Sequence, residues 1–278
     1  MMRILLVVLA TAATALVCVG YKKEILAVID PPVLEYNKIS VGDRFRTTYA
    51  GVIGGQCSAQ IRVLMIGNSL LHNQNVPEMV ARIAKENNDC LAIEASLYGG
   101  GRLFEHVEKW DAVRLIVDGD WTHVLVQPQG MESLVGGERV AGPLRRLTSA
   151  IRQKGAALVL FEPWAYGPKL LSGANFPFGL KTQNEAQRRV SNNIRMLRGN
   201  NTVAPVGSTW RRFAEVNPDA PRLLDADDNH ASIAGGFLEA LVIYSTLFPD
   251  ADLTAGTYRP RGVDAKTAIL MRLHVAGL

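Results

Sequence analysis

Residues 61–72 read Ile-Arg-Val-Leu-Met-Ile-Gly-Asn-Ser-Leu-Leu-His, and this stretch decides the fold. All but one of its first six residues are apolar, which is typical of a strand buried on both faces of a parallel sheet. Gly67 follows at once and allows the chain to turn sharply where that strand ends. The sequence therefore predicts that Asn68 and Ser69 lie at the carboxyl-terminal edge of a sheet.

The same pattern repeats along the rest of the chain, where apolar runs alternate with segments of helical period. The predicted strands are Ile61–Ile66, Leu91–Leu97, His123–Gln127, Ala156–Phe161 and Thr202–Val206. The predicted helices lie near residues 76–87, 102–117, 139–153, 183–198, 207–215, 232–247 and 263–275. Five parallel strands with helices between them predict a three-layer α/β/α domain with a doubly wound, flavodoxin-like sheet.

The composition is that of an ordinary globular protein and excludes several classes. Of the 278 residues, 48% are hydrophobic and 20% are charged, which excludes a disordered, collagen-like or fibrous chain. The 3 cysteines are too few for a disulfide scaffold or a cysteine-based zinc cluster. The 30 basic and 26 acidic residues give a net charge of +4 and form no basic run, so no nucleic-acid partner is expected.

The first twenty residues differ from the rest of the chain. Arg3 precedes the apolar run Ile4–Val19, which is shorter than the about 20 residues of a spanning helix. A basic start before an apolar run is typical of a secretory signal, and Ala13-Thr14-Ala15 offers small residues for cleavage. Residues 1–20 are therefore expected to be a signal peptide or an uncleaved membrane anchor. In both cases the folded part is expected outside the cytoplasm, in the periplasm or secreted.

Residues 21–60 are interpreted as a lead-in segment, and residues 61–278 as one domain that ends in a helical extension. Cys57 lies just before the first predicted strand, and Cys90 lies just before the second. If those strands are neighbours, the two cysteines meet at one end of the sheet and can pair in an oxidising compartment. A Cys57–Cys90 disulfide and two free thiols both remain open at this point.

Polar residues and glycines follow the first three strands, at the edge where such sheets bind ligands. Ser69 follows the first strand and Gly99-Gly100-Gly101 the second, where consecutive backbone amides can approach developing negative charge. Gln127-Pro128-Gln129-Gly130 follows the third strand, and a glutamine there can donate its amide to the same crevice. Each of these features also has a purely structural explanation. Ser69 can cap the next helix, the glycines can form a flexible turn, and the glutamine can bond to local backbone in a loop.

Asp227 and His230 stand three residues apart, just before the predicted helix 232–247. One turn of chain can place this carboxylate against the imidazole, which fixes the tautomer and leaves the other ring nitrogen to accept a proton. Asp225, Asp227 and Asn229 imitate the start of a calcium loop, but His230 replaces its turn glycine. The remaining alternative is a solvated acidic turn that caps the helix.

Together these blocks resemble the SGNH (GDSL-type) hydrolase superfamily over about residues 61–248. The resemblance implies that Ser69 is the nucleophile and that His230 and Asp227 complete a catalytic triad. The first block reads Gly-Asn-Ser here, where Gly-Asp-Ser is usual, and the third reads Gln-x-Gln. These departures are similar to a bacterial branch of the superfamily.

The resemblance also implies an oxyanion hole made by the amides of Ser69 and Gly100 and by a side-chain amide. Gln129 stands where the family has an asparagine. Its side chain ends in the same amide donor but is longer. Asn68 and Gly99 are expected to contact substrate because they lie in the first two blocks. Trp164 is expected near the crevice because it directly follows the fourth predicted strand. No cofactor and no metal ion are implied.

The predicted activity is that of a serine esterase that hydrolyses an acyl ester, such as an O-acetyl group on carbohydrate. Its partner would be a small-molecule or carbohydrate ester, and membrane contact would come only through an uncleaved N-terminal segment. One alternative is a non-catalytic carbohydrate- or partner-binding module on the same fold. Another is a metal-dependent phosphoesterase that uses Asp225, Asp227, Asp228 and His230. The absence of a Gly-x-Ser-x-Gly motif argues against an α/β-hydrolase.

Overall fold

The computed structural model describes residues 35–41, 44–50, 61–173, 176 and 179–277, with side chains from residue 61 onward. The chain divides into two compact units, Met1–Tyr36 and Asn37–Leu278. In the first unit only Glu35 and Tyr36 are described. The predicted signal or anchor and Cys57 lie outside the described residues. Cys90 is disulfide-bonded, and its pairing with Cys57 stays a prediction.

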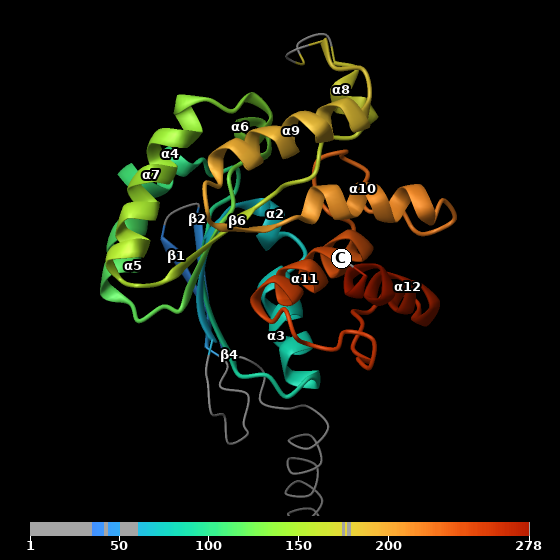
Figure 1. Cartoon of the computed structure of the whole chain (residues 1–278), viewed down its shortest axis with the longest axis horizontal. Helices are drawn as coiled ribbons and strands as arrows, with labels where there is room; N and C mark the ends of the chain where they lie inside the picture. Colours follow the sequence, from blue (N-terminus) through green and yellow to red (C-terminus); the bar gives the residue numbers. More distant parts are fainter. Residues whose placement is uncertain (1–34, 42–43, 51–60, 174–175, 177–178, 278) are drawn as a thin grey trace, which may run out of the picture. The chain divides into compact units, whose positions relative to one another are not determined.

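One sheet of seven strands forms the centre of the second unit, in the order β1-β2-β4-β3-β5-β6-β7 (Figure 1). The strands are β1 (Glu35–Val41), β2 (Arg44–Ala50), β3 (Ile61–Gly67), β4 (Leu91–Leu97), β5 (His123–Val126), β6 (Ala157–Phe161) and β7 (Thr202–Ala204). Five neighbouring strands of this sheet are parallel to one another, namely β4, β3, β5, β6 and β7. Their order is that of a flavodoxin-like sheet, so the predicted fold class is confirmed.

Two strands lie in the segment that was interpreted as a lead-in. β2 pairs antiparallel with β4, with Thr48 opposite Glu94, and β1 follows it at the edge of the sheet. In sequence, both strands mix charged and polar residues with apolar ones, a pattern that is common in antiparallel strands. A search for continuous apolar runs therefore misses them.

The helices are α2 (Ser69–His72), α3 (Val76–Glu86), α4 (Leu103–Glu108), α5 (Ala112–Asp118), α6 (Gly130–Val135), α7 (Glu138–Gln153), α8 (Pro168–Leu171), α9 (Gln183–Leu197), α10 (Val206–Val216), α11 (Ile233–Leu247) and α12 (Ala265–Ala276). The single helix predicted at 102–117 is broken into α4 and α5 at Asp111, which adopts a left-handed conformation with φ of 54°. β7 ends at Ala204 because Pro205 follows it and cannot donate to the ladder. Among the described helices, none is long and apolar enough to cross a bilayer.

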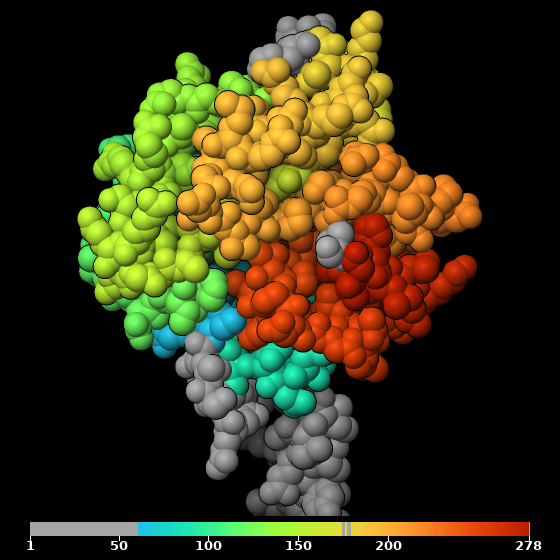
Figure 2. All heavy atoms as spheres, viewed as in Figure 1, coloured from blue at the N-terminus to red at the C-terminus, as the bar shows by residue number. Residues whose placement is uncertain are grey.

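Two layers of helices cover the sheet, which gives the three-layer arrangement (Figure 1). On one face, α4, α5, α7 and α9 enclose a buried cluster with Leu64, Ile66 and Val126. On the other face, α3 contacts β4 and α11, and α11 contacts β7, α10 and α12. Figure 2 shows α11 and α12 adjoining α3 and α10 on this side of the molecule. The side chains of one strand alternate between the two layers, because successive residues point to opposite faces.

Helix α11 is buried almost throughout and carries one ionisable side chain in its centre. Glu239 is fully buried, and neither carboxylate oxygen has a hydrogen-bond partner among the described residues. Burial raises the pKa of this carboxyl well above its usual value of 4.5. Burial therefore favours the protonated, neutral form of Glu239 in the folded protein.

The Glu239→Met variant is expected to be more stable than the wild type at pH 7 by about 1–3 kcal/mol, because an unpaired buried polar group is removed. In the wild type, the unfolded chain loses a proton above pH 4.5 that the folded chain keeps, so stability falls as pH rises from that value. Urea unfolding at pH 5, 6.5 and 8 measures this slope, which the variant should lack. Asp219→Asn, at an exposed carboxylate, is the control, and equal slopes in both variants would contradict the assignment.

Candidate active site

Ser69 is the first residue of α2 and follows the end of β3 directly. Asn68 caps this helix, with its side-chain oxygen accepting the N–H of Leu70 at 3.1 Å. The side-chain amide of Asn68 donates to the carbonyl oxygen of Gly101 at 2.9 Å. Asn68 is only 1% exposed, so the expected substrate contact is corrected: this residue holds Ser69 beside the glycine loop.

The turn before Ser69 is packed too tightly for any residue larger than glycine. A Cβ atom on Gly67 would lie 2.6 Å from Oε1 of Gln127 and 2.9 Å from the side chain of Leu71. That oxygen of Gln127 accepts the backbone N–H of Asn68 at 2.8 Å. Gln127 is fully buried, so it braces the turn instead of donating into the crevice.

His106 supports the same turn from the side of α4. Its Nε2 lies 3.0 Å from the carbonyl oxygen of Gly67, and the ring meets Tyr98 and Trp110 edge to face. A carbonyl only accepts, so Nε2 carries the proton. Burial lowers the pKa of His106 to about 4, and this histidine is neutral near pH 7. Its role is structural, as its place on an amphipathic helix indicates.

The loop before α11 brings His230 to the nucleophile. Nε2 of His230 lies 2.9 Å from Oγ of Ser69, although 161 residues separate them. Nδ1 lies 2.5 Å from Oδ2 of Asp227, while the other oxygen of Asp227 accepts the backbone N–H groups of Asn229 and His230, each at 2.9 Å. With Nδ1 donating to the carboxylate, Nε2 is free to accept the hydroxyl proton of Ser69.

The carboxylate of Asp227 keeps its charge at all working pH values. Partial burial acts to raise its pKa, but hydrogen bonds from the backbone and ring of His230 and from Asn229 outweigh this and lower the pKa to about 2. A fixed negative charge at 2.5 Å stabilises the positive form that His230 takes when it accepts a proton.

The next carboxylate, Asp228, points away from this pair. It is buried, and it accepts the backbone N–H of Lys169 at 2.6 Å and pairs with Arg222. Gly167 donates its N–H to the carbonyl of Asp228 at 2.8 Å, so the loop is fixed against α8. The carboxylates named for a phosphoesterase therefore do not converge. Within the part of the chain that is described, no three His, Cys, Asp or Glu side chains gather as metal ligands would.

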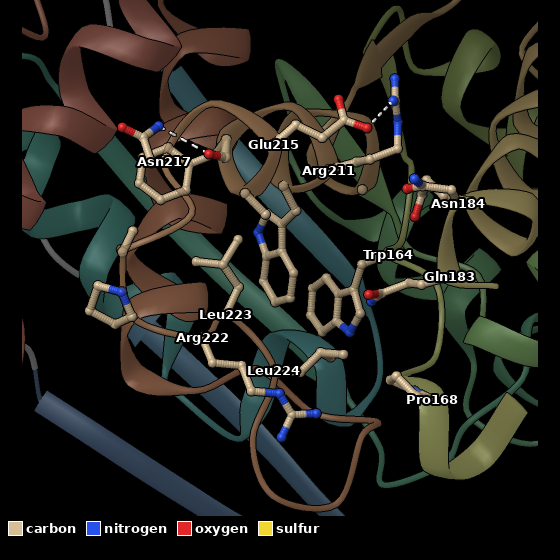
Figure 3. A pocket seen from close by; sticks show the side chains of 17 residues that line it. Trp164, Pro168, Gln183, Asn184, Arg211, Glu215, Asn217, Arg222, Leu223 and Leu224 are labelled. Carbon is tan, nitrogen blue, oxygen red and sulfur yellow. Dashed lines mark hydrogen bonds and ion pairs between the residues drawn. The ribbon is translucent and has the colours of Figure 1, made fainter. Parts of the chain in front are cut away.

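Trp164 holds the loop one residue before His230. Its indole N–H donates to the carbonyl oxygen of Asn229 at 2.9 Å, and its ring stacks on Trp210 with centroids 4.0 Å apart. Trp164 is 4% exposed and lies in the wall of a cavity of about 410 Å³, together with Gln183 and Leu224 (Figure 3). The expected substrate contact is therefore corrected to a contact that positions the catalytic loop.

The Trp164→Phe variant is expected to show a kcat reduced roughly tenfold with little change in KM, because a small displacement of His230 weakens proton transfer more than binding. A six-membered ring that can stack on Trp210 remains, while the pyrrole ring and its hydrogen bond to Asn229 are lost. Steady-state kinetics on 4-nitrophenyl acetate measures the effect.

Trp210→Phe is the matched control for this variant. The N–H of Trp210 is buried and meets no hydrogen-bond acceptor in the described residues, so its removal should leave kcat nearly unchanged. Equal losses in the two variants would mean that ring packing matters and the hydrogen bond to Asn229 does not.

A second contact ties the two halves of the site together, and no sequence pattern indicates it. The side-chain amide of Gln74, in the turn between α2 and α3, donates to the carbonyl oxygen of Ala231 at 2.9 Å. A Cβ atom on Gly236 would lie 2.6 Å from the Cβ of Gln74, so a glycine in α11 permits this approach. Gln74 thus fixes the spacing between the serine and histidine segments.

The glycine loop after β4 is open to solvent. Gly99 and Gly100 are exposed, and Gly100 has a φ of +65°, which favours glycine. A Cβ atom at either position would meet no described atom within 4 Å. The contact between Asn68 and Gly101 holds this loop next to Ser69.

Gln129 differs from the expectation. It caps α6, with its side-chain oxygen accepting the N–H of Glu132 at 3.1 Å, and its side chain also hydrogen-bonds the hydroxyl of Tyr166. Glu132 in turn accepts the N–H groups of Gln129 at 3.2 Å and Leu103 at 3.1 Å. The glutamine side chain folds back onto its own helix and caps it through its oxygen, and its part in the oxyanion hole stays a prediction.

Several solved structures share this fold at low sequence identity. A DUF4886 family protein from Bacteroides uniformis superposes with a TM-score of 0.65 at 17% identity, over 79% of this chain and 94% of that one. A protein from Slackia heliotrinireducens, provisionally assigned to the SGNH hydrolases, gives 0.56 at 24% identity, over 68% and 100%. The acetyl xylan esterase AlAXEase gives 0.52 at 15% identity, over 67% and 100%.

The chain therefore has the SGNH hydrolase fold, which confirms the predicted resemblance at the level of the fold. No protein-family model matches the sequence. No curated protein matches it either.

Proposed function

We propose that this chain, which has the fold of the SGNH hydrolases, is a serine esterase that hydrolyses acyl esters. The observation that carries the proposal is the continuous contact from Oγ of Ser69 through the ring of His230 to the carboxylate of Asp227. A solvated acidic turn would not need a serine hydroxyl at 2.9 Å from Nε2. The structural similarity to an acetyl xylan esterase supports the same class of reaction.

In this mechanism, His230 takes the hydroxyl proton while Oγ of Ser69 forms a bond to the ester carbonyl carbon. The carbonyl electrons move to oxygen, and the amides of Ser69 and Gly100 would stabilise that oxyanion. His230 then gives its proton to the departing alkoxide, which leaves an acyl group on Ser69. Water, deprotonated by His230, attacks this acyl group and regenerates the serine.

The proposed substrate is a small acyl ester, such as an acetyl group on carbohydrate. The exposed glycines at positions 99 and 100 leave room for a bulky alcohol beside the reacting carbon. The apolar N-terminal run supports a place outside the cytoplasm, where acylated polysaccharides occur.

Covalent labelling tests the proposal most directly. A fluorophosphonate probe should modify one serine per chain, and peptide mass spectrometry should locate it at Ser69. Turnover of 4-nitrophenyl acetate should accompany the labelling and persist in EDTA. Labelling and turnover that survive unchanged in Ser69→Ala would contradict the mechanism.

A non-catalytic binding module is the second candidate, because the side chain of Gln129 is engaged by Glu132 and Tyr166. Loss of one oxyanion donor costs roughly 10²–10³ in rate. This candidate is favoured if acetylated oligosaccharides bind without turnover and the fluorophosphonate probe leaves every serine unmodified. Measurable turnover in the wild type decides for the esterase.

A further inference from the structure

A cavity of about 930 Å³ adjoins the proposed oxyanion site. Its wall includes Gly99, Gly100 and Gln129, together with Phe104, Trp110 and Arg139. Apolar rings with a few polar groups are the usual lining of a site for a small organic ligand.

The cavity is built onto the catalytic elements. Asn68, next to the nucleophile, is bonded to the carbonyl of Gly101 at 2.9 Å. Glu132 joins the start of α4 to the start of α6 by accepting the N–H groups of Leu103 and Gln129. A substrate whose carbonyl oxygen lies at the amide of Gly100 would therefore extend part of its structure into this cavity.

The charged side chains in the wall already have hydrogen-bond or ion-pair partners, except for one. Arg102 lies 4.7 Å from the ring centre of Phe104 and pairs with Glu105 at 3.5 Å. Glu105 also receives the ammonium of Lys109 at 3.3 Å. Burial raises the pKa of Glu132, and its carboxyl is occupied by two backbone N–H groups.

The remaining charge is the guanidinium of Arg139, in the first turn of α7. Arg139 is exposed, and it makes no hydrogen bond or ion pair with any residue in the described ranges. A guanidinium binds a carboxylate through two parallel hydrogen bonds, which is geometrically more specific than the contact of a lysine. Arg139 is thus available to a ligand in the cavity.

We propose that the ester substrate of this protein carries a carboxylate group, which Arg139 binds in this cavity. The inference rests on the proposed esterase activity and adds to it the charge of the substrate. The rings of Phe104 and Trp110 would pack against the part of the substrate between its carboxylate and its ester. An acylated sugar acid has this combination of groups.

Two pairs of esters test the proposal and separate the two ends of the substrate. In 4-acetoxybenzoate the carboxylate is on the alcohol part, and its neutral partner is 4-acetoxybenzamide. In mono-4-nitrophenyl succinate the carboxylate is on the acyl part, and its neutral partner is 4-nitrophenyl butanoate. In one of the two pairs, kcat/KM for the anionic ester is expected to exceed that for the neutral ester by about five- to tenfold, as for one partly exposed, charge-assisted contact.

Arg139→Gln should reduce this preference to near one, and 0.5 M NaCl should weaken it in the wild type. Arg152→Gln is the matched control, because it removes an exposed arginine from the same helix at a position outside the cavity wall. Its preference should equal that of the wild type. No preference in either pair, or a preference that Arg139→Gln leaves intact, overturns the carboxylate site while ester turnover still supports the esterase.

If none of the esters is hydrolysed, the proposed function fails and the carboxylate site is tested by binding alone. Calorimetric titration then compares 4-acetamidobenzoate with 4-acetamidobenzamide, which have amide bonds in place of the ester. Tighter binding of the carboxylate that is lost in Arg139→Gln supports the site. Equal binding of the two compounds overturns it.

Discussion

Ester hydrolysis by the Ser69→Ala variant is expected to be roughly 10⁵–10⁶-fold slower than in the wild type, as when the nucleophile of a serine hydrolase triad is removed. The reason is structural: Oγ of Ser69 lies 2.9 Å from Nε2 of His230 at the end of the proton-accepting chain. Without this oxygen no acyl-enzyme can form. Single-turnover kinetics with 4-nitrophenyl acetate measures the loss and avoids the influence of product release.

Ser149→Ala provides the control, because this serine lies exposed on α7. It should retain the activity of the wild type. The melting temperature of Ser69→Ala should also stay close to that of the wild type, since the helix cap is made by Asn68 and does not need the Ser69 hydroxyl. A loss of activity of less than tenfold in a folded Ser69→Ala variant would exclude Ser69 as the nucleophile.

Asp227→Asn is expected to reduce kcat by about 10⁴-fold, because an amide at this position can stabilise the wrong tautomer of the histidine. In the wild type, Oδ2 of Asp227 accepts from Nδ1 of His230 at 2.5 Å, which leaves Nε2 facing Ser69. An asparagine that donates its N–H to Nδ1 moves the ring proton to Nε2, where it blocks proton transfer from the serine. The variant should still bind substrate with a KM near that of the wild type.

The pH dependence separates Asp227 from its neighbours. Hydrogen bonds lower the pKa of Asp227 to about 2 against its partial burial, so its carboxylate does not titrate between pH 4 and 9. The acidic limb of a plot of kcat/KM against pH in the wild type should therefore not report this group. Because the folded pKa lies below the usual 3.8, any stability that Asp227 contributes is present above pH 4 and is lost between about pH 4 and 2.

Asp225→Asn is the matched control for Asp227→Asn, because Asp225 is exposed and its carboxylate accepts only a local N–H, from Ala226 at 2.7 Å. Its kcat should remain within a few-fold of that of the wild type. Equal losses in both variants would show that the general charge of the loop matters, and that Asp227 has no special role in orienting His230.

Much of the fold was predictable because its causes are local. A strand buried on both faces must be apolar along its length, so β3 to β7 could be found as short apolar runs. The contact between Asp227 and His230 is also local, since three residues of chain are enough to bring a carboxylate to an imidazole. Antiparallel strands and helix breaks are less visible in a sequence. β2 has a mixed polar sequence, and the break at Asp111 depends on a left-handed backbone that many sequences could adopt.

The roles of individual side chains at the site were harder to predict. Asn68, Gln129 and Trp164 all lie just after a predicted strand, and each has chemistry suited to a ligand. The structure uses all three inside the protein, to bond Gly101, Glu132 and Asn229. A free polar side chain and one engaged by a distant backbone group look the same in a sequence.

The sequence by itself determined the five parallel strands and the main helices between them, the edge at which function is expected, and the pair Asp227 and His230, because short-range spacing and hydrophobic period control these features. Only the tertiary structure decided that Ser69 meets His230 at 2.9 Å, that Gln74 and Trp164 hold the histidine loop, and that Arg139 remains available at the cavity. These features depend on how residues far apart in the sequence pack together. Packing of that kind is set by the whole core and leaves no periodic mark in the sequence.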